Sequence, residues 1–308
     1  EGRGQLGTGT YHNPAIVKMA VNQSYAETNG AGGHTLAVDA YGNVYAWGYN
    51  SYGQVGAGNT DYYKYPTRVL AGDSPYWYTV DADDVRHYNT DADYAQYDVG
   101  QRYLTGVVDV AAGYDHSVAL LKDGTVLAWG NTYRGQAGDP NGGVARSLAP
   151  QFVRQAGSVG EGYWLNNAIS VSASGASAVE GTSAILRSDG TVFAWGGNAK
   201  QLLGNTTGRG IQGAHAVQTD LDGFTSKGTL DNTILGTNGL PIDPHKDNVN
   251  ATSAIEEDVD LYLVEVGTQL DGIVELDMGQ NHAVALRGDY DAATGIRNSN
   301  TVYTWGTN

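Results

Sequence analysis

The sequence predicts an all-β repeat protein, and three observations lead to this class. One block of residues occurs four times, and each copy alternates apolar and polar residues on both sides of a turn. The 308 residues also include 44 Gly and 21 Tyr but only 3 Phe. Gly supplies the positive φ angles of tight turns and Tyr suits a half-buried pleated surface, so we expect short strands rather than long amphipathic helices.

The clearest copy of the block reads VDVAAGYDHSVALLKDGTVLAWGNTYRGQAG over residues 108–138. Its two alternating halves meet at a Gly-containing turn, and the second half ends in Trp-Gly, a pattern typical of a β-hairpin. Three copies keep a distance of thirteen residues between a His or Thr and this Trp: His34 to Trp47, His116 to Trp129, and Thr182 to Trp195. In the fourth copy His282 precedes Trp305 by twenty-three residues, because residues are inserted at the turn.

The motif order G-x-x-H-x-x-A-L, D-G-x-V-x-x-W-G and N-x-x-G-Q-L-G resembles the repeat of the regulator of chromosome condensation family. The resemblance implies an all-β, β-propeller-like array of four-stranded blades around a central axis. The sequence departs from the family pattern at Gln201, which replaces a Gly, and at Thr182, which replaces a His.

We interpret the chain as a single repeat domain over residues 1–308 with four recognisable repeats and long inserts. The alternative is that the inserts are blades that have lost the motif. The predicted repeat cores lie at about 29–58, 107–139, 179–204 and 273–308, the last continuing into 1–8, and the predicted inserts lie at about 71–106 and 205–267.

The two ends of the sequence carry complementary parts of one motif. If these parts share a blade within one chain, a ring closes; if they join two chains, a tail-to-head contact produces a larger ring or a filament. The candidate residues for this closure are Gly4, Gln5, Leu6, Gly7, Val302, Tyr303, Trp305 and Gly306.

The recurring His and Trp residues have a structural interpretation. His34, His116 and His282 occupy the same point of different repeats, so we expect structural hydrogen bonds rather than a shared metal site or a catalytic base. The repeated Trp residues are expected to pack between blades.

Aromatic residues are concentrated in one insert and are candidates for contacts with another protein, because Tyr and Trp are common at binding hot spots. The alternative is that these rings form the insert's own small core. The candidate residues are Tyr62, Tyr63, Tyr65, Tyr76, Trp77, Tyr78, Tyr88, Tyr94 and Tyr97.

Acidic residues in the same insert offer the oxygen ligands that calcium prefers, although no complete twelve-residue calcium loop is present. The alternative is a solvated acidic surface, and no cofactor other than Ca²⁺ is suggested. The weak metal candidates are Asp81, Asp83, Asp84, Asp91 and Asp93. Sequons for N-glycosylation begin at Asn22, Asn205 and Asn250.

Charge and composition exclude several functions. The formal net charge of −16 opposes contact with nucleic-acid phosphates and anionic lipid, so neither partner is expected. No stretch approaches the ~20 apolar residues of a membrane-spanning helix, so no membrane insertion is expected. The chain has no Cys and no recognisable catalytic motif, so we expect no enzyme activity.

These observations favour a secreted or cell-surface structural protein that self-assembles head-to-tail into a fibre or lattice, with other copies of itself as partners. The alternative is a protein-binding propeller module of inhibitor or adhesion type that uses its Tyr- and Trp-rich loops. A third hypothesis, a carbohydrate-binding or carbohydrate-active protein, rests only on aromatic residues near carboxylates. The absence of Cys is compatible with the expected extracellular location.

Overall fold

A computed structural model describes most of the repeat cores and one insert. Every secondary-structure element in the described ranges is a β-strand, which confirms the predicted all-β class. The described residues contain no helix with the length and apolar character that crossing a membrane requires. The described ranges are 15–22, 33–81, 85–91, 101–138, 146–155, 164–175, 180–197, 203, 211–216, 218–219, 268–280, 282–290 and 297–306.

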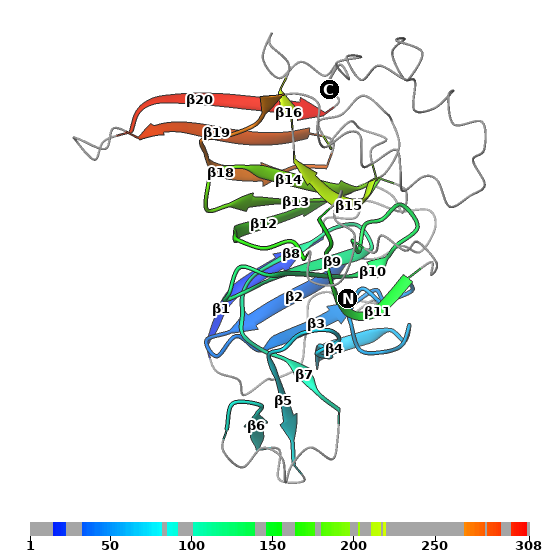
Figure 1. Ribbon diagram of the computed structural model, residues 1–308. Coiled ribbons are helices and arrows are strands. Elements are labelled where there is room, and N and C mark those ends of the chain that lie inside the picture. Colours follow the sequence, from blue (N-terminus) through cyan, green and yellow to red (C-terminus); the bar gives the residue numbers. More distant parts are fainter. Residues whose placement is uncertain are drawn as a thin grey trace, which may run out of the picture.

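Four antiparallel sheets follow one another along the chain and stack face to face in an arc (Figure 1). We number these sheets blades 1 to 4. Blade 1 consists of β1 (Ile16–Val21), β2 (His34–Asp39), β3 (Val44–Gly48) and β4 (Tyr63–Arg68). Blade 2 consists of β8 (Val107–Ala112), β9 (His116–Leu121), β10 (Val126–Asn131) and β11 (Arg146–Phe152). Blade 3 consists of β12 (Ala168–Ser174), β13 (Thr182–Arg187), β14 (Val192–Gly196) and β15 (Ile211–Ala216).

Blade 4 has three strands in the part of the chain that the structure describes, where a four-stranded blade was expected. They are β18 (Ile273–Met278), β19 (His282–Tyr290) and β20 (Arg297–Gly306). The first strands of neighbouring blades contact one another: β1 meets β8, β8 meets β12, and β12 meets β18. We call these four the inner strands.

The two central strands of each blade form a hairpin whose turn uses a Gly with a positive φ angle. In blade 2, Gly124 has a φ of 85°, and its N–H donates to the Leu121 carbonyl oxygen at 2.9 Å. Gly42 and Gly190 hold the same place in blades 1 and 3, each with a φ of 81°. The Asp-Gly and Tyr-Gly pairs of the repeats are therefore turns, as the sequence predicts.

The central strands are buried along their whole length, because blades pack on both of their faces. On β9, Ala119 and Leu121 belong to the core between blades 1 and 2, whereas Val118 and Leu120 belong to the core between blades 2 and 3. Alternating apolar and polar residues are typical of a sheet with one face exposed to solvent. A strand between two blades is buried on both faces, so this pattern underestimates its burial.

The last blade has an uncovered face. Val44, Val126 and Val192 begin the third strand of blades 1, 2 and 3, and each is 0% exposed. Val302 holds the same place relative to the Trp of blade 4 and is 60% exposed. Within the part of the chain that the structure describes, Val302 on the outer face of blade 4 therefore lacks the cover that its counterparts in the other blades have.

The first predicted insert folds as a separate sheet at the blade 1 end of the arc (Figure 1). Its strands are β5 (Trp77–Val80), β6 (Arg86–Tyr88) and β7 (Tyr103–Leu104), in the order β6-β5-β7, and we call them the insert sheet. β16 (Gln218–Thr219) and β17 (Thr268–Gln269) form a two-stranded sheet. Both β15 of blade 3 and β16 lie within the second predicted insert, residues 205–267, most of which lies outside the described residues.

Candidate functional site

The repeated Trp residues join neighbouring blades. Trp129 and Trp195 are both 0% exposed. The indole N–H of Trp129 donates to the Gln54 carbonyl oxygen at 2.8 Å, and that of Trp195 donates to the Gln136 carbonyl oxygen at 3.0 Å. Each Trp thus fills an inter-blade core while its N–H bonds to the Gly-Gln turn of the preceding blade, which confirms the predicted packing role.

Two of the three repeated His residues, His34 and His116, also join blades, as predicted, whereas His282 is exposed on β19. His34 Nε2 lies 2.8 Å from Ser117 Oγ, and His116 Nε2 lies 2.8 Å from Ser183 Oγ. Burial lowers the pKa of both His side chains to about 3, so both are neutral at physiological pH. Neither imidazole is available to a substrate, and these side chains are structural.

The insert sheet is built around one buried Tyr. Tyr78 is 0% exposed, and the centroid of its ring lies 5.5 Å from the ring centroids of both Tyr88 and Tyr103. Burial raises the pKa of the Tyr78 hydroxyl, which keeps it protonated. Tyr78 was a candidate partner contact, and this is corrected: its side chain belongs to the insert's own core and reaches no surface.

Arg86 anchors the insert sheet to blade 1. Its guanidinium lies 3.2 Å from the carboxylate of Asp39, whose side chain is fully buried, and it donates to the Tyr45 hydroxyl. The same guanidinium lies 5.4 Å from the ring centroid of Tyr78. A charge-assisted pair of this kind is geometrically specific, so the insert sheet is fixed in orientation on the blade.

Other aromatic residues of the segment do remain at the surface. Tyr62 is 37% exposed and Tyr65 is 57% exposed, and both lie at or next to the edge strand β4. Trp77 on β5 is partly buried, and the guanidinium carbon of Arg102 lies 4.3 Å from its ring centroid. We call Tyr62, Tyr65, Trp77 and Arg102 the aromatic end surface; β4 and the insert sheet lie at the same end of the arc (Figure 1).

Three other aromatic candidates either form hydrogen bonds within the fold or are half-buried. Tyr63 accepts a hydrogen bond from Asn59 Nδ2 at 2.9 Å, and the Tyr76 hydroxyl donates to Asp123 at 3.1 Å. Tyr88 is half-buried on β6. Tyr94 and Tyr97 lie outside the described residues.

The acidic candidates that the structure describes organise the insert backbone. Asp81 accepts from the Val85 N–H at 2.9 Å and lies 2.8 Å from His87 Nε2, and Asp91 accepts from the Tyr88 N–H at 2.9 Å. No group of three His, Cys, Asp or Glu side chains that could hold a metal occurs within the described ranges. Asp83, Asp84 and Asp93 fall outside them, so the calcium site stays a prediction.

The predicted closure residues divide into two groups. Trp305 is 4% exposed and packs in the core between blades 3 and 4, as Trp129 and Trp195 do in their interfaces. Tyr303 is half-buried, and Gly306 ends β20 with a φ of 113°. Gly4, Gln5, Leu6 and Gly7 lie outside the described residues, so the joining of the two ends stays a prediction.

Only one of the three sequons is described. Asn22 is 8% exposed, and its Nδ2 atom, the one that a glycan would modify, donates to the Tyr114 carbonyl oxygen at 2.6 Å. Asn205 and Asn250 lie outside the described residues.

Sequence reasoning missed the two Arg residues of the insert. Arg86 and Arg102 are each placed over an aromatic ring, and one of them also neutralises a buried carboxylate. The available signal was the presence of Arg within a Tyr-rich segment, because guanidinium groups commonly stack on aromatic rings.

Comparisons with known proteins agree with this architecture. Models of the regulator of chromosome condensation (RCC1) repeat match residues 41–75 and 107–136. The chain is similar to the Ultraviolet-B receptor UVR8 of Arabidopsis thaliana, at 28% identity over 138 residues, which is 44% of this chain and 24% of that protein. It is also similar to Protein RCC1 of Candida albicans, at 29% identity over 163 residues, which is 53% of this chain and 30% of that protein. The chain thus matches less than a third of the length of these relatives.

A solved structure supports the fold. The crystal structure of human WBSCR16 matches with a TM-score of 0.50 and 18% sequence identity, covering 99% of this chain and 55% of that one. The likeness shows the fold alone. The repeat motif, the stacked antiparallel blades and both repeat models support a β-propeller fold built from repeats of the regulator of chromosome condensation type.

Proposed function

We propose that the chain is a protein-binding propeller module that contacts its partner through the aromatic end surface. The observation that carries this proposal is the exposure of Tyr65, which is 57% exposed on β4, the edge strand of blade 1. Large aromatic side chains bury much area for little loss of conformational entropy, which is why Tyr, Trp and Arg dominate binding hot spots.

The geometry around Trp77 supports the same surface. Arg102 stacks over the Trp77 ring at 4.3 Å, so both side chains are already ordered without a partner. The insert sheet beneath them is fixed by the Arg86–Asp39 pair. A surface ordered in advance loses less entropy on association, which favours affinity. The proposal includes no catalytic step.

A pair of Tyr substitutions tests this proposal. Tagged wild-type, Tyr65→Ala and Tyr133→Ala proteins are used to capture partners, which are quantified by mass spectrometry. Tyr133 is 64% exposed in a turn of blade 2, so it is a matched control of similar exposure outside the aromatic end surface. We expect Tyr65→Ala to weaken capture of a specific protein and Tyr133→Ala to retain it. Equal capture by all three proteins would contradict the proposed surface.

Self-assembly through blade 4 is a second candidate, and a specific observation favours it. Val302 is 60% exposed, while its counterpart Val192 is 0% exposed beneath the next blade. A second copy that covered this face would form a heterologous or isologous contact of the kind that builds fibres, lattices or dimers. This second candidate function includes the extracellular or cell-surface location that is expected from the sequence.

Light scattering on wild-type and Val302→Lys proteins tests the second candidate. Lys at an exposed position leaves the fold intact but places a charge in any contact across this face. We expect a wild-type mass above that of one chain that falls to one chain in the variant. A wild-type protein of one-chain mass at high concentration would exclude this candidate and leave the aromatic end surface unaffected.

A further inference from the structure

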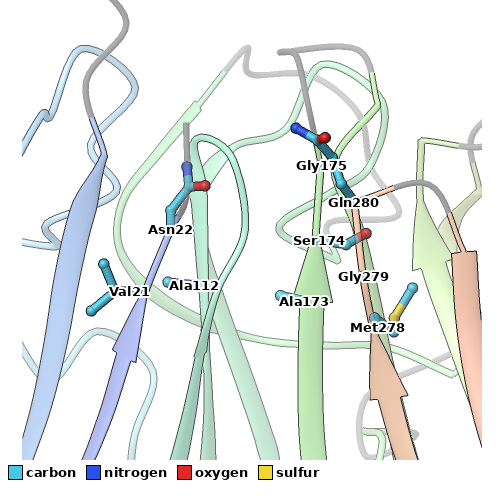
Figure 2. A pocket seen from close by; sticks show the side chains of 9 residues that line it. All are labelled: Val21, Asn22, Ala112, Ala173, Ser174, Gly175, Met278, Gly279 and Gln280. Atoms are coloured by element: carbon cyan, nitrogen blue, oxygen red, sulfur yellow. The ribbon is translucent and has the colours of Figure 1, made fainter. Parts of the chain in front are cut away.

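The ends of the four inner strands surround a cavity of about 310 Å³ (Figure 2). Each repeat contributes the residue at the same position of its inner strand to the cavity wall. These residues are Val21, Ala112, Ala173 and Met278. On the second strand of its blade, each of them pairs with the residue that directly follows the His or Thr of the repeat motif. These four side chains are uncharged and small or flexible. The cavity is therefore a product of the repeat architecture, with an apolar wall supplied by every blade.

The next position along each strand decides the polarity of the cavity. It is Gly113 in blade 2 and Gly279 in blade 4, where only two residues separate the Gly from His116 or His282. A Cβ atom on Gly113 would lie 2.0 Å from Cε1 of His116, so a side chain is sterically excluded there. Blades 1 and 3 have longer connections before their His34 or Thr182.

The two blades with longer connections carry polar side chains at this position, Asn22 and Ser174. Both residues line the cavity (Figure 2). In blade 3 the replacement of His by Thr182 accompanies the replacement of Gly by Ser174, so the hydroxyl occurs where the imidazole is absent. The departure from the family pattern at Thr182 thus coincides with a new polar group in the cavity wall.

Among the described residues the Ser174 hydroxyl has no hydrogen-bond partner, although Ser174 is only 6% exposed. A buried polar group without a partner costs free energy, and a ligand in the cavity would supply the missing bond. Asn22 lines the cavity from blade 1, across from Ser174 on blade 3, and its Nδ2 atom donates to the Tyr114 carbonyl oxygen at 2.6 Å, which leaves its Oδ1 atom as the acceptor on that side (Figure 2). Gln280 adds an exposed amide at the rim.

The chemical groups that line the cavity indicate the class of ligand that fits it. None of the nine described residues that line the cavity is charged, so a phosphate, a carboxylate or an ammonium group would find no counter-charge. None is aromatic, so a sugar ring would find no stacking surface. The polar groups offer one acceptor at Asn22 and a donor–acceptor hydroxyl at Ser174. This combination matches a neutral group that both donates and accepts.

We propose that this cavity binds a neutral amide, the side-chain carboxamide of an Asn or Gln residue on a loop of a protein partner. The amide N–H donates to Asn22 Oδ1, the amide oxygen accepts from the Ser174 hydroxyl, and the aliphatic part of the loop contacts Val21 and Ala112. The volume lies at the lower end of the range of ~300–1,000 Å³ that is usual for ligand pockets. The choice of a protein partner rests on the proposed function, but the chemistry of the cavity can be tested without that partner.

The two Met residues of the chain provide the measurement. Met278 lines the cavity, whereas Met19 lies on β1 outside the lining and is 60% exposed. Protein labelled with ¹³C at the Met methyl groups is titrated with N-acetyl-asparagine methylamide and followed by NMR. Two probes with the same acetyl and methylamide groups serve as controls, the aspartate analogue, whose side chain is charged, and the leucine analogue, whose side chain is apolar.

We expect the asparagine probe to shift the Met278 resonance in a saturable way, to leave Met19 unshifted, and to bind more tightly than either control probe. Ser174→Ala should weaken the asparagine probe about two- to tenfold, the effect of one neutral hydrogen bond. Ser170→Ala, on the same strand but outside the lining, should leave the affinity unchanged. Equal affinity for the three probes, a shift of Met19 alone, or no effect of Ser174→Ala would overturn the proposal. The capture experiment with Tyr65→Ala tests the aromatic end surface and not the cavity, so either proposal can fail without the other.

Discussion

The Nε2 atom of His34 lies 2.8 Å from the Oγ atom of Ser117 across the interface between blades 1 and 2. Ser117 donates its single hydroxyl proton to the Gln54 carbonyl oxygen at 2.7 Å, so His34 must be the donor through Nε2–H. The same Gln54 oxygen accepts from the Trp129 indole at 2.8 Å. The His and Gln of blade 1 and the Trp of blade 2 therefore meet in one buried network across the interface.

Removing the hydroxyl of Ser117 should break this network. Ser117→Ala leaves the His34 Nε2–H buried without an acceptor, so we expect the free energy of unfolding to fall by about 1–3 kcal/mol in urea titrations. Ser188→Ala, the same change at an exposed turn residue, should change it by less than about 0.5 kcal/mol. Equal effects of the two substitutions would show that the network contributes little.

Buried titratable groups give the fold a defined pH dependence. Burial lowers the pKa of His34 and His116 to about 3, from 6.5 in the unfolded chain. Burial raises the pKa of Asp115 from 3.8 to about 7. Between pH 4 and 6 the unfolded state therefore binds two more protons at the His residues and the folded state binds one more at Asp115. The net difference of one proton predicts that the free energy of unfolding falls by about 1.4 kcal/mol per pH unit as the pH decreases from 6 to 4.

Two substitutions separate these opposing groups in urea titrations at pH 4, 5 and 6. Asp115→Asn removes the group whose contribution to the free energy of unfolding increases as the pH falls, so the slope should steepen to about 2.7 kcal/mol per pH unit. His116→Gln removes one of the two groups whose contribution to the free energy of unfolding decreases as the pH falls, so the slope should approach zero. Slopes that do not move in these opposite directions would contradict the assignment.

The repeat core could be predicted from the sequence because its signals are local. A Gly turn between two short alternating runs specifies a hairpin, and the constant distance from His34 to Trp47 places both at its open end. The insert sheet could not be predicted in this way, since β6, β5 and β7 pair across residues with no short turn signal. The role of Tyr78 depends on Arg86 and on blade 1, which are long-range partners that no local pattern reveals.

The buried ion pair of the insert sheet should be the main contact that holds it to blade 1. Arg86→Met leaves the fully buried carboxylate of Asp39 without its cation, so we expect a loss of about 3–5 kcal/mol in the free energy of unfolding. Adding Asp39→Asn should recover part of that loss, because the uncompensated charge is removed. Lys18→Met breaks the more exposed pair with Asp109 and should cost less than about 1 kcal/mol. The idea fails if Arg86→Met and Lys18→Met cost the same.

The packing of Gly113 against His116 explains why blade 2 keeps a Gly directly after its inner strand β8, whereas blade 1, with a longer connection before His34, has Asn22 at this position. A Cβ atom at residue 113 would lie 2.0 Å from Cε1 of His116, and the imidazole is held in place by Ser183 at 2.8 Å. We expect Gly113→Ala to lower the free energy of unfolding by about 1–3 kcal/mol, the usual cost of overpacking a core.

Blade 3 supplies the compensating change. It has Thr182 at the position of His116, with Ser174 at the position of Gly113, so the double variant Gly113→Ala with His116→Thr should be more stable than the sum of its single effects predicts. A double-mutant cycle from urea titrations measures this coupling, and Gly113→Ala combined with Ser188→Ala is the control pair without contact. Additive effects in the first cycle would show that the imidazole moves aside freely, and would remove the steric reason for the Gly.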